Sequence, residues 1–358
     1  MALPVALLSA VLLIAGCSDP VAGAGIGGIV AGEGSGTPAL PEVATVALQA
    51  IAASADTKQS VVVIDTPVLN GIAARQGYPA ADDDGGDPAG RSRSESAYLE
   101  LNPVREPCRS LDESFAPLRT APAGPSITVG SRTDGKDGTV SRCAGPADLA
   151  LLRKNFAGGD GEPTTVDGVE GLLAGDTFIG IDTAADATLI RDGEPRSAVV
   201  SQLVGGTAVQ GSLWQDPDVV AVLSQLPGAA VAVLGTDMVQ VPRGLAPPAV
   251  SAALATVVER TGFGQPPVPE FGGFGWIPGD RLVGTSVFVT LYGSDQEAAT
   301  ATSILTAVWA ELGTSKYTGA VTRQLGPTVV TSLAGTTSTE FMLQDLRLAE
   351  YPGFLDRG

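Results

Sequence analysis

The chain has 358 residues, of which 44% are hydrophobic and 17% charged, and its formal net charge is −18. This length allows one large or two ordinary domains, and the hydrophobic fraction excludes a chain disordered throughout. The negative charge repels phosphates, so we expect no nucleic acid partner. The chain has no histidine, which excludes Ser-His-Asp and Cys-His nucleophiles and the usual zinc sites, and we expect no metal or cofactor.

The chain begins with a short apolar run, Leu3–Ile14, followed by Ala15, Gly16 and Cys17. The run is too short for a bilayer core, which needs about 20 residues, and fits a cleaved signal better. A secretory signal normally starts with a basic residue, but the first one here is Lys58. The alternative is an uncleaved hydrophobic N-terminus with an incidental cysteine.

The pattern resembles the signal of bacterial lipoproteins. This resemblance implies that residues 1–16 are removed as a signal peptide and that Cys17 carries a diacylglyceryl group. Two acyl chains anchor a protein stably where one chain is marginal. The resemblance therefore predicts a protein anchored by lipid at the extracytoplasmic face of the cell membrane.

Residues 17–40 are rich in glycine and alanine and predict a flexible tether behind the lipidated cysteine. Residues 41–163 predict an N-terminal α/β region with long loops. Its elements are a helix over 41–55, a buried strand over 60–65, a solvated loop over 79–96 and a short helix over 149–156.

Two cysteines remain besides Cys17, namely Cys108 and Cys143. In an oxidising compartment such a pair forms a disulfide, here closing a loop of about 36 residues. Residues 121–138 within that loop are rich in Pro, Gly, Ser and Thr and would be floppy without it. The alternative is two separate buried thiols.

Residues 164–358 predict a C-terminal α+β region, which can form one domain with the preceding region. The predicted strands span 175–182, 188–191, 198–203, 230–241, 281–292, 327–333 and 341–346. The predicted helices begin at Asp216-Pro217, at Pro247, and at the capping box Ser294-Asp295-Gln296-Glu297. The fold class is therefore α+β, with a mixed or antiparallel sheet and helices on one face. A ferredoxin-like arrangement is a candidate for this half.

No catalytic residue stands out. Strand-like segments end in Asp65-Thr66 and Asp182-Thr183, a fragment shared with aspartic proteases. Those enzymes continue with glycine, whereas Pro67 and Ala184 follow here, so a turn-forming aspartate is the better interpretation. The acidic groups at 82–87 and 134–137 lack EF-hand spacing and predict solvated loops rather than a calcium site.

One segment concentrates aromatic side chains in a Gly/Pro-rich stretch, with Phe263, Phe271, Phe274 and Trp276 between residues 263 and 278. If the segment forms a surface loop, its aromatic side chains could bind a ligand or anchor a partner protein. The alternative, which we favour, is a long loop that folds back and buries them.

In composition the chain also resembles exported lipoproteins of actinobacteria, although the specific resemblance covers residues 1–20 alone. It implies a non-enzymatic envelope lipoprotein that binds a ligand or partner, such as a lipid or an envelope protein. A lipid carrier with an apolar cavity is the second hypothesis. A histidine-free hydrolase using carboxylates is the third.

Overall fold

The computed structural model describes residues 40–75, 125–133, 136–145, 162–166, 168–174, 177–182, 187–193, 199, 202–204, 206–236, 238–239, 248–262, 266–279, 283–312 and 319–337. Every described residue belongs to one compact unit, Gly36–Gly358. The predicted signal run with Cys17, the loop over 79–96, the helix over 149–156 and the strand over 341–346 lie outside the described residues.

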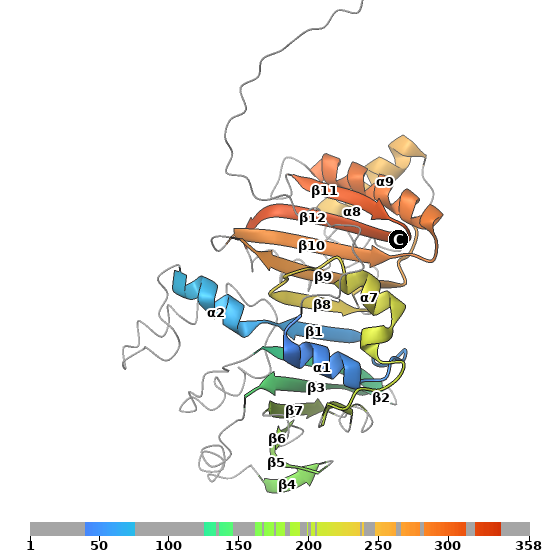
Figure 1. The fold of residues 1–358 in the computed structure, drawn as a ribbon. Helices are drawn as coiled ribbons and strands as arrows, with labels where there is room; N and C mark the ends of the chain where they lie inside the picture. Colours follow the sequence, from blue (N-terminus) through green and yellow to red (C-terminus); the bar gives the residue numbers. More distant parts are fainter. Residues whose placement is uncertain are drawn as a thin grey trace, which may run out of the picture. The chain divides into compact units, whose positions relative to one another are not determined.

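A twelve-stranded sheet organises the described part of the chain (Figure 1). From one end to the other, the strands are β11 (Ala320–Leu325), β12 (Thr328–Thr337), β10 (Val283–Leu291), β9 (Phe271–Pro278), β8 (Val231–Gly235), β1 (Ser60–Ile64), β2 (Ser126–Thr133), β3 (Lys136–Ala144), β7 (Ala187–Gly193), β6 (Thr177–Asp182), β5 (Val169–Ala174) and β4 (Glu162–Val166). Every pairing between these strands is antiparallel. The predicted antiparallel sheet is thus confirmed.

Helices pack on both faces of the sheet, so the prediction of a single helical face is wrong. One face carries α1 (Glu42–Ala50), the short helix η2 (Leu213–Gln215) and α7 (Pro217–Leu223). The other face carries α2 (Thr66–Arg75), α8 (Pro248–Thr261) and α9 (Asp295–Leu312). The reason lies in β1 and β8, whose side chains are apolar on both faces, as in any strand buried from both sides.

The ferredoxin-like arrangement is also wrong for the C-terminal half. That fold splits its β-α-β units, so the two strands joined by a helix are separated by another strand. Here β8 and β9, which are joined through α8, are direct antiparallel neighbours.

The sheet instead consists of two similar halves that meet at β1 and β8. Outward from this centre, β1, β2, β3, β7 and β6 follow one another in the first half, as β8, β9, β10, β12 and β11 do in the second. Both halves begin in the same chain order, α1-β1-α2-β2-β3 and α7-β8-α8-β9-β10. The first helix of each half lies on one face and the second helix on the other. Because β1 and β8 run antiparallel, the halves are related by an approximate two-fold axis normal to the sheet.

The strand registers support this correspondence. Ser60, the first residue of β1, corresponds to Val231, the first residue of β8. Ser60 pairs with Gly130 of β2, and Val231 pairs with Trp276 of β9, so Gly130 corresponds to Trp276. At the outer hairpins, the pair of Asp182 with Ala187 corresponds to the pair of Leu325 with Thr328. The hairpin formed by β4 and β5 extends the first half beyond β6, whereas no described strand lies beyond β11. The expected domain boundary at 163/164 falls within β4 and does not separate the two halves.

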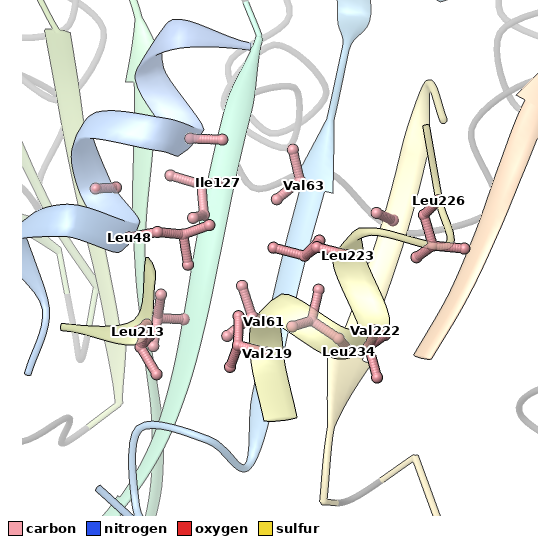
Figure 2. Packing of buried hydrophobic residues seen from close by; sticks show 14 of the residues in the cluster. Leu48, Val61, Val63, Ile127, Leu213, Val219, Val222, Leu223, Leu226 and Leu234 are labelled. Atoms are coloured by element: carbon pink, nitrogen blue, oxygen red, sulfur yellow. The ribbon is translucent and has the colours of Figure 1, made fainter. Parts of the chain in front are cut away.

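The core on the α1–α7 face joins both halves (Figure 2). Leu48 of α1 lies against Ile127 of β2, and Val219 and Leu223 of α7 point toward β1 and β8. These side chains are at most 1% exposed. Burying one such aliphatic side chain contributes about 1.5–3 kcal/mol to the free energy of unfolding. This hydrophobic cluster therefore holds helices from both halves against the same sheet.

Local signals explain where the C-terminal helices begin. The Asp216 carboxylate accepts from the backbone N–H groups of Asp218 and Val219 at 3.0 and 3.2 Å, with Pro217 at the first helical position. The Ser294 hydroxyl accepts from the backbone N–H of Glu297 at 3.2 Å. Both predicted helix starts are confirmed.

Several predicted elements are wrong. Residues 121–138, which were expected to be floppy without the disulfide, include β2 and the start of β3, and 263–278 include β9 rather than a loop alone. Within the predicted strand over 198–203, Gln202 and Leu203 are helical. The sequence analysis also missed α2, β4, β5 and β11.

Candidate functional site

The aromatic segment does not form a surface site. Phe271, Phe274 and Trp276 lie on β9, near the middle of the sheet, and are 1%, 0% and 0% exposed. Phe274 packs against Phe288 with ring centroids 4.8 Å apart. The surface hypothesis is therefore wrong for these three residues, while Phe263 lies outside the described residues.

Cys143 lies on β3 and is 5% exposed, in contact with Ile190. Cys108 lies outside the described residues. Cys143 is disulfide-bonded, while its pairing with Cys108 stays a prediction, as does lipidation of Cys17.

The two aspartates of the Asp-Thr fragments are far apart. Asp65 follows β1, and Asp182 ends β6, four strand positions away across the sheet. With about 4.8 Å between neighbouring strands, this separation is on the order of 19 Å. A carboxylate pair that shares a proton needs contact, so these residues do not form an aspartic-protease dyad. Asp65 instead accepts from the backbone N–H of Val68 at 3.2 Å at the start of α2.

A compact charged cluster joins the start of α7 to the turn before β1. The Lys58 ammonium lies 2.6 Å from the Asp218 carboxylate and 3.2 Å from that of Asp216, and 5.8 Å from the ring centre of Phe271. Burial alone lowers the pKa of Lys58, but the hydrogen bonds to Asp218 and Asp216 outweigh it and raise the pKa above its ordinary value. Lys58 therefore stays protonated. The cluster stabilises the contact between α7 and the turn before β1 and does not act as an acid–base pair.

A second polar group is buried on the first half of the sheet. Arg142 of β3 is 4% exposed and donates from Nη1 to the carbonyl oxygen of Leu203 at 2.9 Å. Burial lowers the pKa of Arg142, while the charge of Asp182 acts in the opposite direction. This arginine ties the segment before α7 to the sheet, which assigns it a structural role.

Tyr292 is also unsuited to catalysis at neutral pH. The residue is 3% exposed, and burial raises the pKa of its phenol to about 12, although a hydrogen bond with Thr290 acts in the opposite direction. The phenol therefore remains protonated and cannot serve as a general base.

Two kinds of feature are absent from the described part of the chain. No group of three or more Cys, Asp or Glu side chains there is arranged to hold a metal ion. None of the helices described there is long and apolar enough to cross a membrane.

Comparisons with known proteins give little further information. No protein-family model matches the chain, and no curated protein sequence matches it. Among solved structures, crystal form I of TP0453 aligns with a TM-score of 0.41 and 11% identity over 84% of this chain and 96% of that one. Crystal form III of TP0453 gives a TM-score of 0.39 with 10% identity, over 84% and 97% of the two chains. These similarities are too low to carry an argument about function.

The charged cluster could not be recognised in the sequence, because its members are distant in the chain. Asp216 was recognised as a helix cap, but Lys58 precedes it by 158 residues, and no local pattern connects the two. The pairing of β1 with β8 brings them together, since the backbone N–H of Thr236 after β8 donates to the carbonyl oxygen of Lys58.

Proposed function

We propose that this chain is a lipid-anchored, non-enzymatic envelope protein that binds a ligand or partner at the extracytoplasmic face of the membrane. The observation that carries the proposal is the apolar run Leu3–Ile14 followed by Ala15, Gly16 and Cys17. A diacylated cysteine would hold the folded body at the membrane without any protein segment that crosses it.

The carboxylates of the charged cluster and of the two Asp-Thr fragments do not support hydrolysis. Asp216 caps α7 and pairs with Lys58, as does Asp218. Asp65 and Asp182, the pair singled out by the sequence, lie four strand positions apart. None of these residues is arranged as the acid and base that a histidine-free hydrolase needs.

The lipid-carrier alternative requires an apolar cavity between sheet and helices. Between the sheet and α9, the space is occupied by packed side chains such as Trp276, Phe288 and Ile304, which are 0%, 3% and 0% exposed. This packing favours a closed core there, so we retain partner binding as the proposed function.

The test is intact-mass and fractionation analysis of the full chain expressed in a bacterium that processes lipoproteins. The expected result is a membrane-bound protein that lacks residues 1–16 and carries a diacylglyceryl group on Cys17. Cys17→Ser should move the protein out of the detergent-extracted membrane fraction, whereas the neighbouring control Ser18→Ala should not. Recovery of the unprocessed chain with a free thiol at position 17 would refute the anchor.

A further inference from the structure

The two ends of the sheet differ in how they are protected. An edge strand exposes backbone N–H and C=O groups that can pair with another chain, and proteins block this with proline, charge or short length. β4, at one end, has five residues and contains Glu162 and Pro163. β11, at the other end, has six residues with one charge, Arg323, but contains no proline, and its Val321 and Leu325 are 60% and 41% exposed.

The first half of the molecule shows what such an edge can accept. β6, which corresponds to β11, is covered by β5 in an antiparallel pairing that places Leu173 opposite Phe178. Phe178 and Asp182 of β6 correspond to Val321 and Leu325 of β11, by the registers with β7 and β12. Phe178 and Asp182 are 0% and 6% exposed, so the corresponding positions are buried in the half that has the additional hairpin.

The side chains of β11 define the chemistry of the strand that would fit. Val321, Arg323 and Leu325 alternate along the strand and therefore share one face of the sheet. The other face is engaged by α9, since the Gln324 amide donates to the carbonyl oxygen of Asp295 at 2.8 Å. A complementary antiparallel strand places apolar residues opposite Val321 and Leu325 and an acidic residue opposite Arg323.

We propose that β11 is a docking edge for an extended segment of another protein, which adds antiparallel to it with an apolar–acidic–apolar pattern on one face. A second copy of this chain fits less well. An antiparallel pairing of two copies that sets Val321 opposite Leu325 would place Arg323 opposite its own copy, and like charges opposite each other are destabilising. β11 would thus be the surface through which the chain binds the partner of the proposed function. This binding does not depend on the lipid anchor.

The test measures binding of a blocked, fluorescently labelled peptide, Thr-Val-Thr-Glu-Thr-Val-Thr, to the full chain by fluorescence anisotropy. We expect saturable binding and slower amide hydrogen exchange along 320–325. Replacing the probe's glutamate by lysine should weaken binding by about tenfold, and Arg323→Glu should reverse this preference. A probe with proline in place of its inner threonines should not bind, because it lacks backbone donors.

Because Arg323 lies on an edge strand, Arg323→Glu should retain the wild-type circular dichroism spectrum, which controls for folding. Equal binding of both charged probes to wild type and Arg323→Glu, or protection confined to other strands, would overturn the proposal. So would a dimer that Val321→Lys dissociates, since that result assigns the edge to a second copy. Failure of lipidation at Cys17 leaves this measurement unaffected, which separates it from the anchor test.

Discussion

At the scale of single residues, Asp216 has more than one structural role. Its carboxylate caps α7 and also pairs with Lys58, and the side chain is 11% exposed. Asp218 pairs with the same ammonium but is 37% exposed and caps nothing. We expect Asp216→Ala to lower the free energy of unfolding by about 1–2 kcal/mol. Asp218→Ala should cost only about 0–1 kcal/mol, because water screens a half-exposed ion pair.

Urea denaturation of both variants measures this difference, and Asp216→Asn separates the two roles. Asparagine caps a helix about as well as aspartate but carries no charge. If capping dominates, Asp216→Asn should recover most of the stability that Asp216→Ala loses. Equal losses for Asp216→Ala and Asp218→Ala would show that the cap contributes nothing measurable.

At the scale of elements, the halves differ in how the first helix meets the second strand. Ile127 and Val129 of β2 correspond to Gly273 and Gly275 of β9, by the registers that match Gly130 with Trp276. A Cβ atom on Gly273 would lie 2.5 Å from Cγ1 of Val222 on α7. Val222 is 0% exposed and has no room to move away. The glycine thus allows α7 to pack directly on the backbone of β9.

We expect Gly273→Ala to lower the free energy of unfolding by about 1–3 kcal/mol, the usual cost of overpacking a core. Gly130→Ala on β2 is the matched control, because its nearest neighbour would be Cβ of Ser60 at 3.2 Å. Thermal unfolding should show a clearly lower midpoint for Gly273→Ala than for Gly130→Ala, because the Ser60 neighbour of Gly130 needs to shift by only a few tenths of an ångström. Similar midpoints would mean that α7 shifts without cost.

The same glycines show why sequence analysis succeeded for some elements and failed for others. Helices with caps, such as those at Asp216 and Ser294, could be predicted because the signal lies within a few residues. The glycines at 272, 273 and 275 make β9 look like a loop, although Gly273 is required by the close approach of α7 and Gly275 by that of the segment after α7. For the candidate site, sequence placed the cap at Asp216 but not its partner Lys58, because their contact depends on strand pairing between the halves.

At the scale of the whole molecule, the duplicated sheet raises the question of whether each half is a separate folding unit. The layers on both faces argue against it. The cluster under α8 and α9 includes Ile64 and Leu69 from the first half. The cluster under α7 likewise includes Val61 and Ile127. Separating the halves would expose both clusters and leave β1 and β8 as mostly apolar edge strands, each unpaired on one side.

We therefore expect a single cooperative unfolding transition, although a chain of this length often unfolds in steps. Trp276 and Trp309 lie on β9 and α9 of the second half, whereas Trp214 lies on η2, next to α1, so two of the three tryptophans report on the second half. Far-UV circular dichroism reports on both halves. The two signals should give the same urea midpoint, and hydrogen exchange of β3 and β10 should show the same limiting protection. A circular dichroism change that precedes or follows the fluorescence change would show that one half unfolds alone, and that the β1–β8 seam couples the halves less than their shared core implies.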